Sequence, residues 1–143
     1  MAGKSTFMRS MMVTALLANC GLAVPAKTAK IPRFDSYFLR ATSHDVPAQG
    51  KSSFALEMDD LRIMLRDATP RSLLALDEIG KGTSSRDGAT LCGALLEYLS
   101  AGNLTCVFAT HLHEIIHLPL HAPRVKARQM AVHVAKREGN ESA

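Results

Sequence analysis

A continuous apolar run that ends in two acids constrains the fold of this chain more than any other feature. The run Ser72-Leu73-Leu74-Ala75-Leu76 is followed directly by Asp77-Glu78. A short apolar run without alternation is typical of a strand buried on both faces, and such strands occur in parallel sheets covered by helices. A second run of this kind spans Thr105 to Ala109 and ends at Thr110-His111. We therefore expect adjacent, inner, parallel strands over 72–77 and 105–110.

Helical segments separate the expected strands. Residues 6–20 lack Gly and Pro and are rich in Met, Leu and Ala, which favours a helix over about 4–20 that ends before Gly21. Apolar residues recur at helical spacing over 53–66, behind a capping serine at 52 or 53. The remaining expected elements are a strand at 34–39, a helix at 89–99, a short helix after His111 and a last strand at 125–134.

This alternation of strands and helices predicts the α/β class, with a parallel sheet and helices on both of its faces. In such folds the functional residues belong at the carboxyl ends of the strands. Asp77-Glu78 and Thr110-His111 occupy those ends, so we expect them to meet at one edge of the sheet.

Composition limits the function classes. The 143 residues suffice for one domain, and 47% apolar with 21% charged residues excludes a disordered tail and a coiled coil. Three cysteines without CxxC spacing argue against a disulfide scaffold and favour reduced core thiols. A net charge of +4 permits an anionic ligand and does not establish one.

The amino-terminal segment fits more than one template. Residues 1–34 contain no Asp or Glu, and Met11 to Val24 is almost entirely apolar. A secretory signal peptide or an organellar transit peptide has this character. The apolar stretch is too short to span a membrane, and we expect no membrane partner.

The same segment also matches part of the pattern of a phosphate-binding loop. Gly3-Lys4-Ser5-Thr6 completes the second half of the GxxxxGK[ST] pattern, and the first Gly of the pattern would lie before Met1. In that pattern the backbone amides at the helix start hold phosphates, Lys4 reaches the outer phosphates and Ser5 binds Mg²⁺. A GKS triplet alone occurs by chance, so this interpretation needs a second motif.

Asp77-Glu78 supplies that second motif. A buried strand followed by two acids is the Walker B arrangement, in which Asp77 would bind the metal and Glu78 the attacking water. The alternative is that both acids are solvated or cap the next helix.

Histidines gather after the second buried strand. His111 could contact the γ-phosphate from the strand end. His111, His113, His117 and His121 could instead form a transition-metal cluster, although Pro119 interrupts the helical face that would join the last two.

The motifs together resemble the ATPase domain of the MutS family of DNA mismatch-repair proteins. The most specific stretch, from Leu76 to Gly88, is similar to the family's DEIGRGTSTxDG, with Lys81 replacing Arg. Phe108 to His111 resembles FATH, and Met1 to Thr6 resembles the end of GPNMGGKST. The run from Gly50 to Phe54 resembles GRSTF, with the family's EM following as Glu57-Met58. These matches occur in family order over about residues 1–120, and some look closest to the plant organellar branch.

The resemblance implies a fold and a set of roles. It implies an ABC-like P-loop NTPase sheet, here incomplete, with a partial ATPase domain over 1–134 and a polar tail over 135–143. It implies ATP and Mg²⁺ as cofactors, bound where two subunits meet. The implied sites are Gly3, Lys4, Ser5 and Thr6 for nucleotide, Ser5 and Asp77 for metal, Glu78 and His111 for catalysis, and Ser52 for the partner subunit's γ-phosphate.

The resemblance also changes the interpretation of both ends of the chain. Residues 1–20 fit the P-loop helix better than a signal peptide, because only the P-loop explains Asp77, Glu78 and His111. The family's Gly-Pro-Asn, the strand before it and the DNA-binding domains have no counterpart in this sequence. We interpret the sequence as a partial chain and expect it, in isolation, to be marginally stable and to bind ATP weakly or not at all.

By the same resemblance, the intact protein is expected to couple ATP hydrolysis to the recognition of mismatched double-stranded DNA, through domains absent here, as a homodimer or heterodimer. The sequence does not tell its compartment; the resemblance implies an intracellular one, with the mitochondrion, the plastid and the nucleus as alternatives. Two other functions stay open. One is another P-loop ATPase of the ABC or recombination type, and the other is a remnant without activity.

Overall fold

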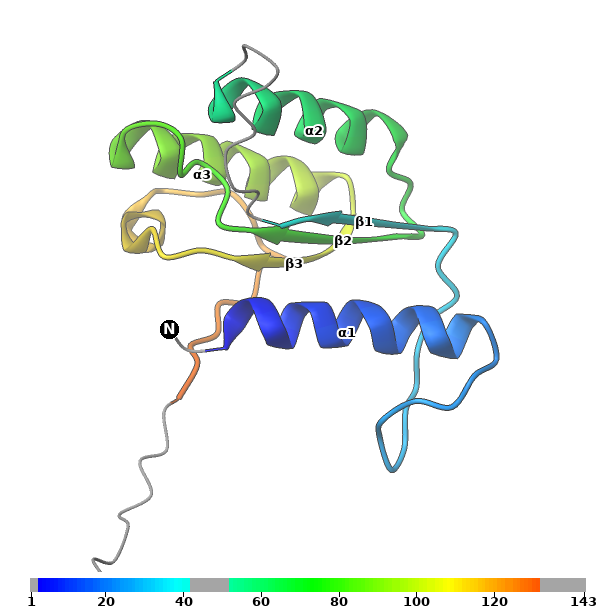
Figure 1. The fold of residues 1–143 in the computed structure, drawn as a ribbon. Helices are drawn as coiled ribbons and strands as arrows, with labels where there is room; N and C mark the ends of the chain where they lie inside the picture. Colours follow the sequence, from blue (N-terminus) through cyan, green and yellow to red (C-terminus); the bar gives the residue numbers. More distant parts are fainter. Residues whose placement is uncertain (1–2, 42–51, 132–143) are drawn as a thin grey trace, which may run out of the picture.

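The computed structural model describes residues 3–41 and 52–131, and they form a three-layer α/β arrangement (Figure 1). Three parallel strands form the sheet in the order β1-β2-β3: β1 (Ser36–Arg40), β2 (Ser72–Asp77) and β3 (Thr105–Ala109). The register pairs Leu39 with Ala75 and Ala75 with Val107. The predicted parallel α/β sheet is thus confirmed for the described residues.

Helices cover both faces of the sheet, as expected. Helix α1 (Lys4–Asn19) packs against one face, and α2 (Ser53–Asp67) and α3 (Ser85–Ala101) cover the other (Figure 1). A short 3₁₀ helix, η2 (His113–His117), follows β3 and contacts α3. None of the described helices is long and apolar enough to span a bilayer.

Each face of the sheet has its own apolar core. Side chains of β2 point alternately to the two sides, so Leu74 and Leu76 pack under α2 and α3, whereas Leu73 and Ala75 pack against α1. All six residues of β2 are buried, which is why this strand shows no polar alternation in the sequence. The central strand therefore positions Asp77 from a rigid support.

Two expectations about the strands are wrong. β3 lies at an edge of the three described strands and is not an inner strand. The last strand expected at 125–134 is absent over 125–131, and the rest of that range lies outside the described residues. Leu118 and Leu120 approach Gly93 of α3, and the amides of His121 and Arg124 donate to Glu97 and Ser100 of that helix. Residues 123 to 131 are exposed. Without a neighbouring strand this segment has no backbone partners for a ladder.

The boundaries of two helices refine the expectations. α3 begins at Ser85, four residues earlier than expected, because Ser84 caps it by accepting a hydrogen bond from the Asp87 amide (3.1 Å). α1 ends at Asn19, and Gly21 follows with a φ of 76°, the left-handed conformation that favours glycine after a helix.

Candidate functional site

The carboxyl ends of β2 and β3 place the predicted residues next to one another. Asp77 is in register with Ala109, and the Glu78 amide donates to the Ala109 carbonyl over 2.9 Å. This extra hydrogen bond continues the pairing one residue beyond the strand. Asp77-Glu78 and Thr110-His111 therefore leave the sheet side by side, as the sequence predicts.

The amino-terminal end of α1 lies at the same edge of the sheet (Figure 1). Gly3 is its N-cap residue, in the left-handed conformation with φ 67° and ψ 14°. A Cβ at Gly3 would meet no atom within 4 Å, so backbone conformation and not crowding favours glycine there. Gly3 has no side chain to accept from the first-turn amides, unlike the serines that cap α2 and α3. This helix end can therefore offer amides and partial positive charge to an anion.

Lys4 joins α1 to the end of β3. Its ammonium nitrogen, Nζ, donates to the Thr110 carbonyl oxygen over 2.8 Å, across 106 residues of sequence. Lys4 also helps to lower the pKa of Glu78 through its charge. The predicted phosphate-binding lysine and the predicted Walker B acid thus share one edge of the sheet.

Asp77 is buried and incompletely hydrogen-bonded. The residue is 4% exposed, and its Oδ1 has no hydrogen-bond partner among the described residues. A buried carboxylate oxygen without a donor is costly unless a cation or water binds it. Its surroundings therefore suit a hard cation.

Glu78 lies between two basic side chains, Lys81 and His111. Its Oε2 lies 3.0 Å from Lys81 Nζ and its Oε1 lies 3.8 Å from His111 Nδ1, with the carboxyl side chain 20% exposed. The hydrogen bond from Lys81 is the main reason that the pKa of Glu78 lies below its ordinary value, and the charges of Lys81, His111 and Lys4 add to it. Glu78 is consequently ionised at neutral pH and can orient a water molecule.

Other predicted residues are only partly brought to this edge. Ser5 and Thr6 lie in the first turn of α1, half-buried and exposed respectively. Ser52 caps α2 across the sheet from α1, with its hydroxyl oxygen accepting from the Ala55 amide over 3.2 Å. Gly50 and Lys51 lie outside the described residues.

The alternative metal site is not assembled. Over residues 3–41 and 52–131, no group of three or more His, Cys, Asp or Glu side chains is arranged to hold a metal ion. The histidines after β3 therefore do not form the cluster that their spacing suggested.

Sequence reasoning missed three contributors to the site. The Thr110 carbonyl, which binds Lys4, carries no sequence signal because any residue supplies it. Lys81 had a signal, since it follows Glu78 by three residues. Glu57 had a clearer one, because the helical spacing of Phe54, Glu57 and Leu61 puts an acid on the buried face of α2.

Comparison with known proteins identifies the family of this chain. The profile of the family described as MutS domain V matches residues 1–141. This chain belongs to that family. It is 46% identical over 138 residues to the DNA mismatch repair protein MutS of Thermus thermophilus, a match that covers 96% of this chain and 16% of the relative.

Two further relatives show the breadth of the family. The MutS protein of Clostridioides difficile is 44% identical over 134 residues, covering 92% of this chain and 14% of the relative. The mitochondrial DNA mismatch repair protein MSH1 of Arabidopsis thaliana is 43% identical over 128 residues, covering 90% and 11%. The chain therefore spans about a sixth or less of the length of these relatives, and bacterial and plant proteins resemble it to a similar degree.

Proposed function

We propose that this chain is the ATPase domain of a DNA mismatch-repair protein, with an ABC-like P-loop site at the carboxyl edge of its sheet. The observation that carries the proposal is the convergence of Lys4, Asp77 and Glu78 there. Lys4 bonds to the residue that follows β3, Asp77 ends the neighbouring strand, and Glu78 follows it. The MutS domain V match supports this proposal over another ABC-type or recombination-type ATPase.

In this proposal each residue at the carboxyl edge of the sheet has a separate role. Lys4 and the first-turn amides from Gly3 to Thr6 bind the phosphates of ATP. Glu78 accepts a hydrogen bond from the attacking water and orients it, a task that its ionised state suits. His111 lies beside Glu78 and contacts the γ-phosphate end of the site, so it responds to hydrolysis.

The buried carboxylate of Asp77 and the hydroxyl of Ser5 are the proposed Mg²⁺ ligands. The unpartnered Oδ1 of Asp77 fits a hard cation, and Mg²⁺ needs only one or two protein ligands when phosphates and water complete its shell. When bound, Mg²⁺ neutralises charge that develops on the transferred phosphoryl group. The protein's contribution is to hold Asp77 rigidly at the end of a buried strand.

The proposed macromolecular partners lie beyond this site. Mismatched double-stranded DNA would be bound by other parts of the whole protein, and ATP turnover would be coupled to that recognition. A homodimer or heterodimer would let Ser52 reach the nucleotide of the other subunit, because within one subunit its hydroxyl caps α2 across the sheet from Lys4. Both partners are proposals from the family and its mismatch-repair members.

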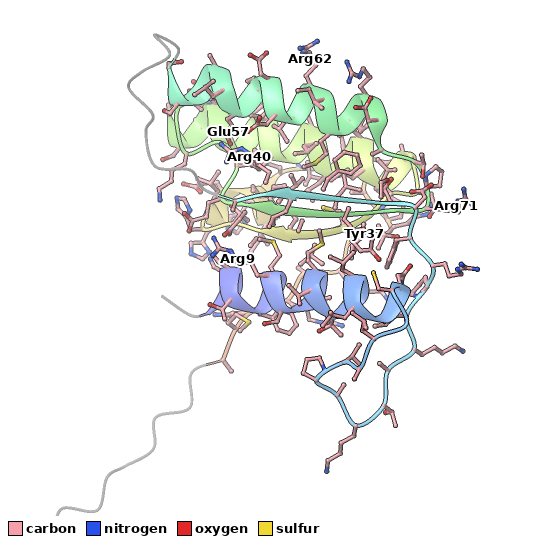
Figure 2. All side chains as sticks on the ribbon, turned by 45° about the vertical axis from the view of Figure 1, so that its right-hand side comes forward. Arg9, Tyr37, Arg40, Glu57, Arg62 and Arg71 are labelled. Atoms are coloured by element: carbon pink, nitrogen blue, oxygen red, sulfur yellow. The ribbon has the colours of Figure 1, made fainter. Side chains whose placement is uncertain are left out.

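Amide chemical shifts would test the site directly. Millimolar Mg·ATP added to the labelled chain should move the amides of Gly3 to Thr6 and those of Glu78 and His111. Lys4→Ala should abolish these changes, whereas Arg9→Ala, which removes a cation from the same helix (Figure 2), should preserve them. Changes that survive Lys4→Ala, or that centre on Arg71 at the opposite edge, would contradict the proposal. Absence of any change would favour a remnant without activity.

A further inference from the structure

Glu57 is a buried acid that the proposed chemistry does not use. It lies on α2, is 6% exposed, and its Oε1 accepts a hydrogen bond from the Gly80 amide over 2.7 Å. Figure 2 shows it on the side of α2 that faces the sheet, whereas Arg62 of the same helix points outward. A buried carboxylate costs free energy unless it is hydrogen-bonded, so this contact determines where the Gly80 turn sits.

The turn that Glu57 holds is the one that follows Glu78. Gly80 has a φ of 82°, and a Cβ there would lie 2.8 Å from the Gly88 Cα atom. Ile79, which lies between Glu78 and Gly80, is 1% exposed, and its carbonyl accepts a hydrogen bond from the Cys92 thiol over 3.3 Å. The turn is therefore packed against α3 on one side and fixed by α2 on the other. Glu78 therefore has little freedom to adopt another position unless α2 or α3 moves with it.

A second contact joins α2 to the same loop. A Cβ at Gly82 would lie 3.0 Å from the Phe54 Cβ atom, so the backbone of the loop rests on the first turn of α2. Ser52 is the N-cap of that helix. One rigid helix thus carries Ser52 at its end and contacts the loop after Glu78 at Phe54 and at Glu57.

We propose that Glu57 is a positioning residue that couples the Ser52 end of α2 to the Glu78 turn through the Gly80 amide. A displacement of the α2 amino terminus moves Glu57, and the Gly80 amide follows because the carboxylate is its buried acceptor. The role of Glu78 rests on the proposed function, but the coupling itself is a property of the described contacts. It gives a physical route by which a group bound at Ser52 changes the orientation of Glu78.

Hydrogen exchange of the Gly80 amide tests the coupling without nucleotide. In the full chain, Glu57→Met removes the acceptor at similar length, and Glu57→Gln keeps an acceptor oxygen. We expect Glu57→Met to speed Gly80 exchange by about tenfold or more relative to the amides of α3, since a hydrogen bond to a charged group is lost. Glu57→Gln should stay within about threefold of the original rate.

A matched control separates coupling from general stability. Asp60 lies on α2 like Glu57, and its Oδ2 is 3.1 Å from Nε of Arg40 at the end of β1. Asp60→Asn removes this carboxylate and should leave Gly80 exchange unchanged relative to α3. Should Glu57→Met fail to fold, Glu57→Asp shortens the acceptor by one methylene and should accelerate Gly80 exchange in the same direction. Equal acceleration of Gly80 and α3, or failure of Glu57→Gln to restore protection, would overturn the proposal.

A nucleotide measurement distinguishes failure of this inference from failure of the proposed function. In the intact Thermus thermophilus MutS protein with saturating Mg·ATP, methionine at the position that matches Glu57 by motif should slow single-turnover hydrolysis on the order of 10²-fold. The dissociation constant should change by less than about threefold, because Glu78 is misplaced and Lys4 is not. If the intact MutS protein neither binds nor hydrolyses ATP, the proposed function fails and the exchange result alone decides the role of Glu57. A variant that loses binding and hydrolysis together would show that Glu57 is not a positioning residue for Glu78.

Discussion

Glu78 adopts a left-handed backbone conformation that is uncommon for a residue with a side chain. Its φ is 53°, and Gly80 follows at 82°. Such a conformation costs about 1–3 kcal/mol and persists only where the surroundings enforce it. The hydrogen bond from the Glu78 amide to Ala109 and the buried Ile79 supply that enforcement. In this backbone conformation the Glu78 carboxylate lies beside Lys81 and His111.

The charge environment of Glu78 gives a prediction for Lys81. Because the hydrogen bond from Lys81 is the main cause of the lowered pKa, Lys81→Met should raise the pKa of Glu78 toward its ordinary value of 4.5. The carboxyl carbon shift of Glu78, followed from pH 7 to acid by NMR, measures this. Lys126→Met, a lysine outside the site, should leave the titration unchanged.

The lowered pKa of Glu78 also determines how the stability of the fold depends on pH. A carboxyl with a lowered folded-state pKa stabilises the fold above its unfolded pKa and loses that contribution as pH falls through its folded pKa. The contribution of the Glu78 and Lys81 pair should therefore be complete at neutral pH, begin to fall near the ordinary pKa of 4.5, and be lost once the pH falls below the lowered pKa of Glu78 in the folded chain. The free energy of unfolding of Lys81→Met and of the original chain should differ at pH 7 and converge below the pKa of Glu78. An equal difference under both conditions would contradict this.

The cysteines give a further prediction at the residue scale. Burial raises the pKa of Cys92 to about 11 and that of Cys106 to about 12, whereas Cys20 is exposed. At pH 8 iodoacetamide should therefore modify Cys20 much faster than the other two thiols, as peptide mass spectrometry would measure. Comparable rates for all three in the folded chain would mean that β3 and α3 do not pack as described.

At the scale of elements, β2 supports the whole site. Leu74 is completely buried beneath α2 and α3, so Leu74→Ala should reduce the free energy of unfolding by about 2–5 kcal/mol. Leu39→Ala on β1 removes the same atoms from a side chain that is 49% exposed and should cost less than about 1.5 kcal/mol. Urea unfolding of both variants gives the comparison. Equal losses would show that β2 is not the central strand.

Most elements could be predicted from the sequence because each one carries a local signal. The unbroken apolar run of β2 and the capped, periodic segment of α2 are examples. The first turn of α3 was missed because Ser85-Arg86-Asp87 is polar and exposed, as a loop would be. The strand expected at 125–134 failed because strand formation depends on a partner that local sequence does not reveal.

The candidate site could also be predicted in part, because several of its residues lie next to elements that carry a local sequence signal. Lys4, Asp77, Glu78 and His111 lie at element ends that topology brings to one edge, so their meeting followed from the α/β pattern. The contacts that orient them did not follow. The Thr110 carbonyl and the Glu57 carboxylate act through tertiary contacts that span 106 and 23 residues of sequence.

At the scale of the whole molecule, the two edges of the sheet differ in how their polar groups are satisfied. At the amino-terminal edge, Asp35 accepts hydrogen bonds from Thr69 (2.7 Å), Ser36 (3.0 Å) and Ser72 (3.3 Å). The hydrogen bond from Thr69 is the main reason that the pKa of Asp35 is lowered. The carboxyl-terminal edge instead holds the unpartnered Oδ1 of Asp77 and the uncapped start of α1. This contrast supports the proposal that the carboxyl-terminal edge is the one that binds the nucleotide.

The central claim is that one edge of the sheet binds Mg·ATP through Lys4 and hydrolyses it through Glu78. Its most direct test compares binding and single-turnover hydrolysis in the intact Thermus thermophilus MutS protein, with alanine at the positions that match Lys4 and Glu78 by motif. We predict that the Glu78 substitution preserves Mg·ATP binding and slows hydrolysis by about 10²-fold or more, whereas the Lys4 substitution weakens binding as well. Equal loss of binding in both variants would contradict the claim, because Glu78 would then support the structure and not the attacking water.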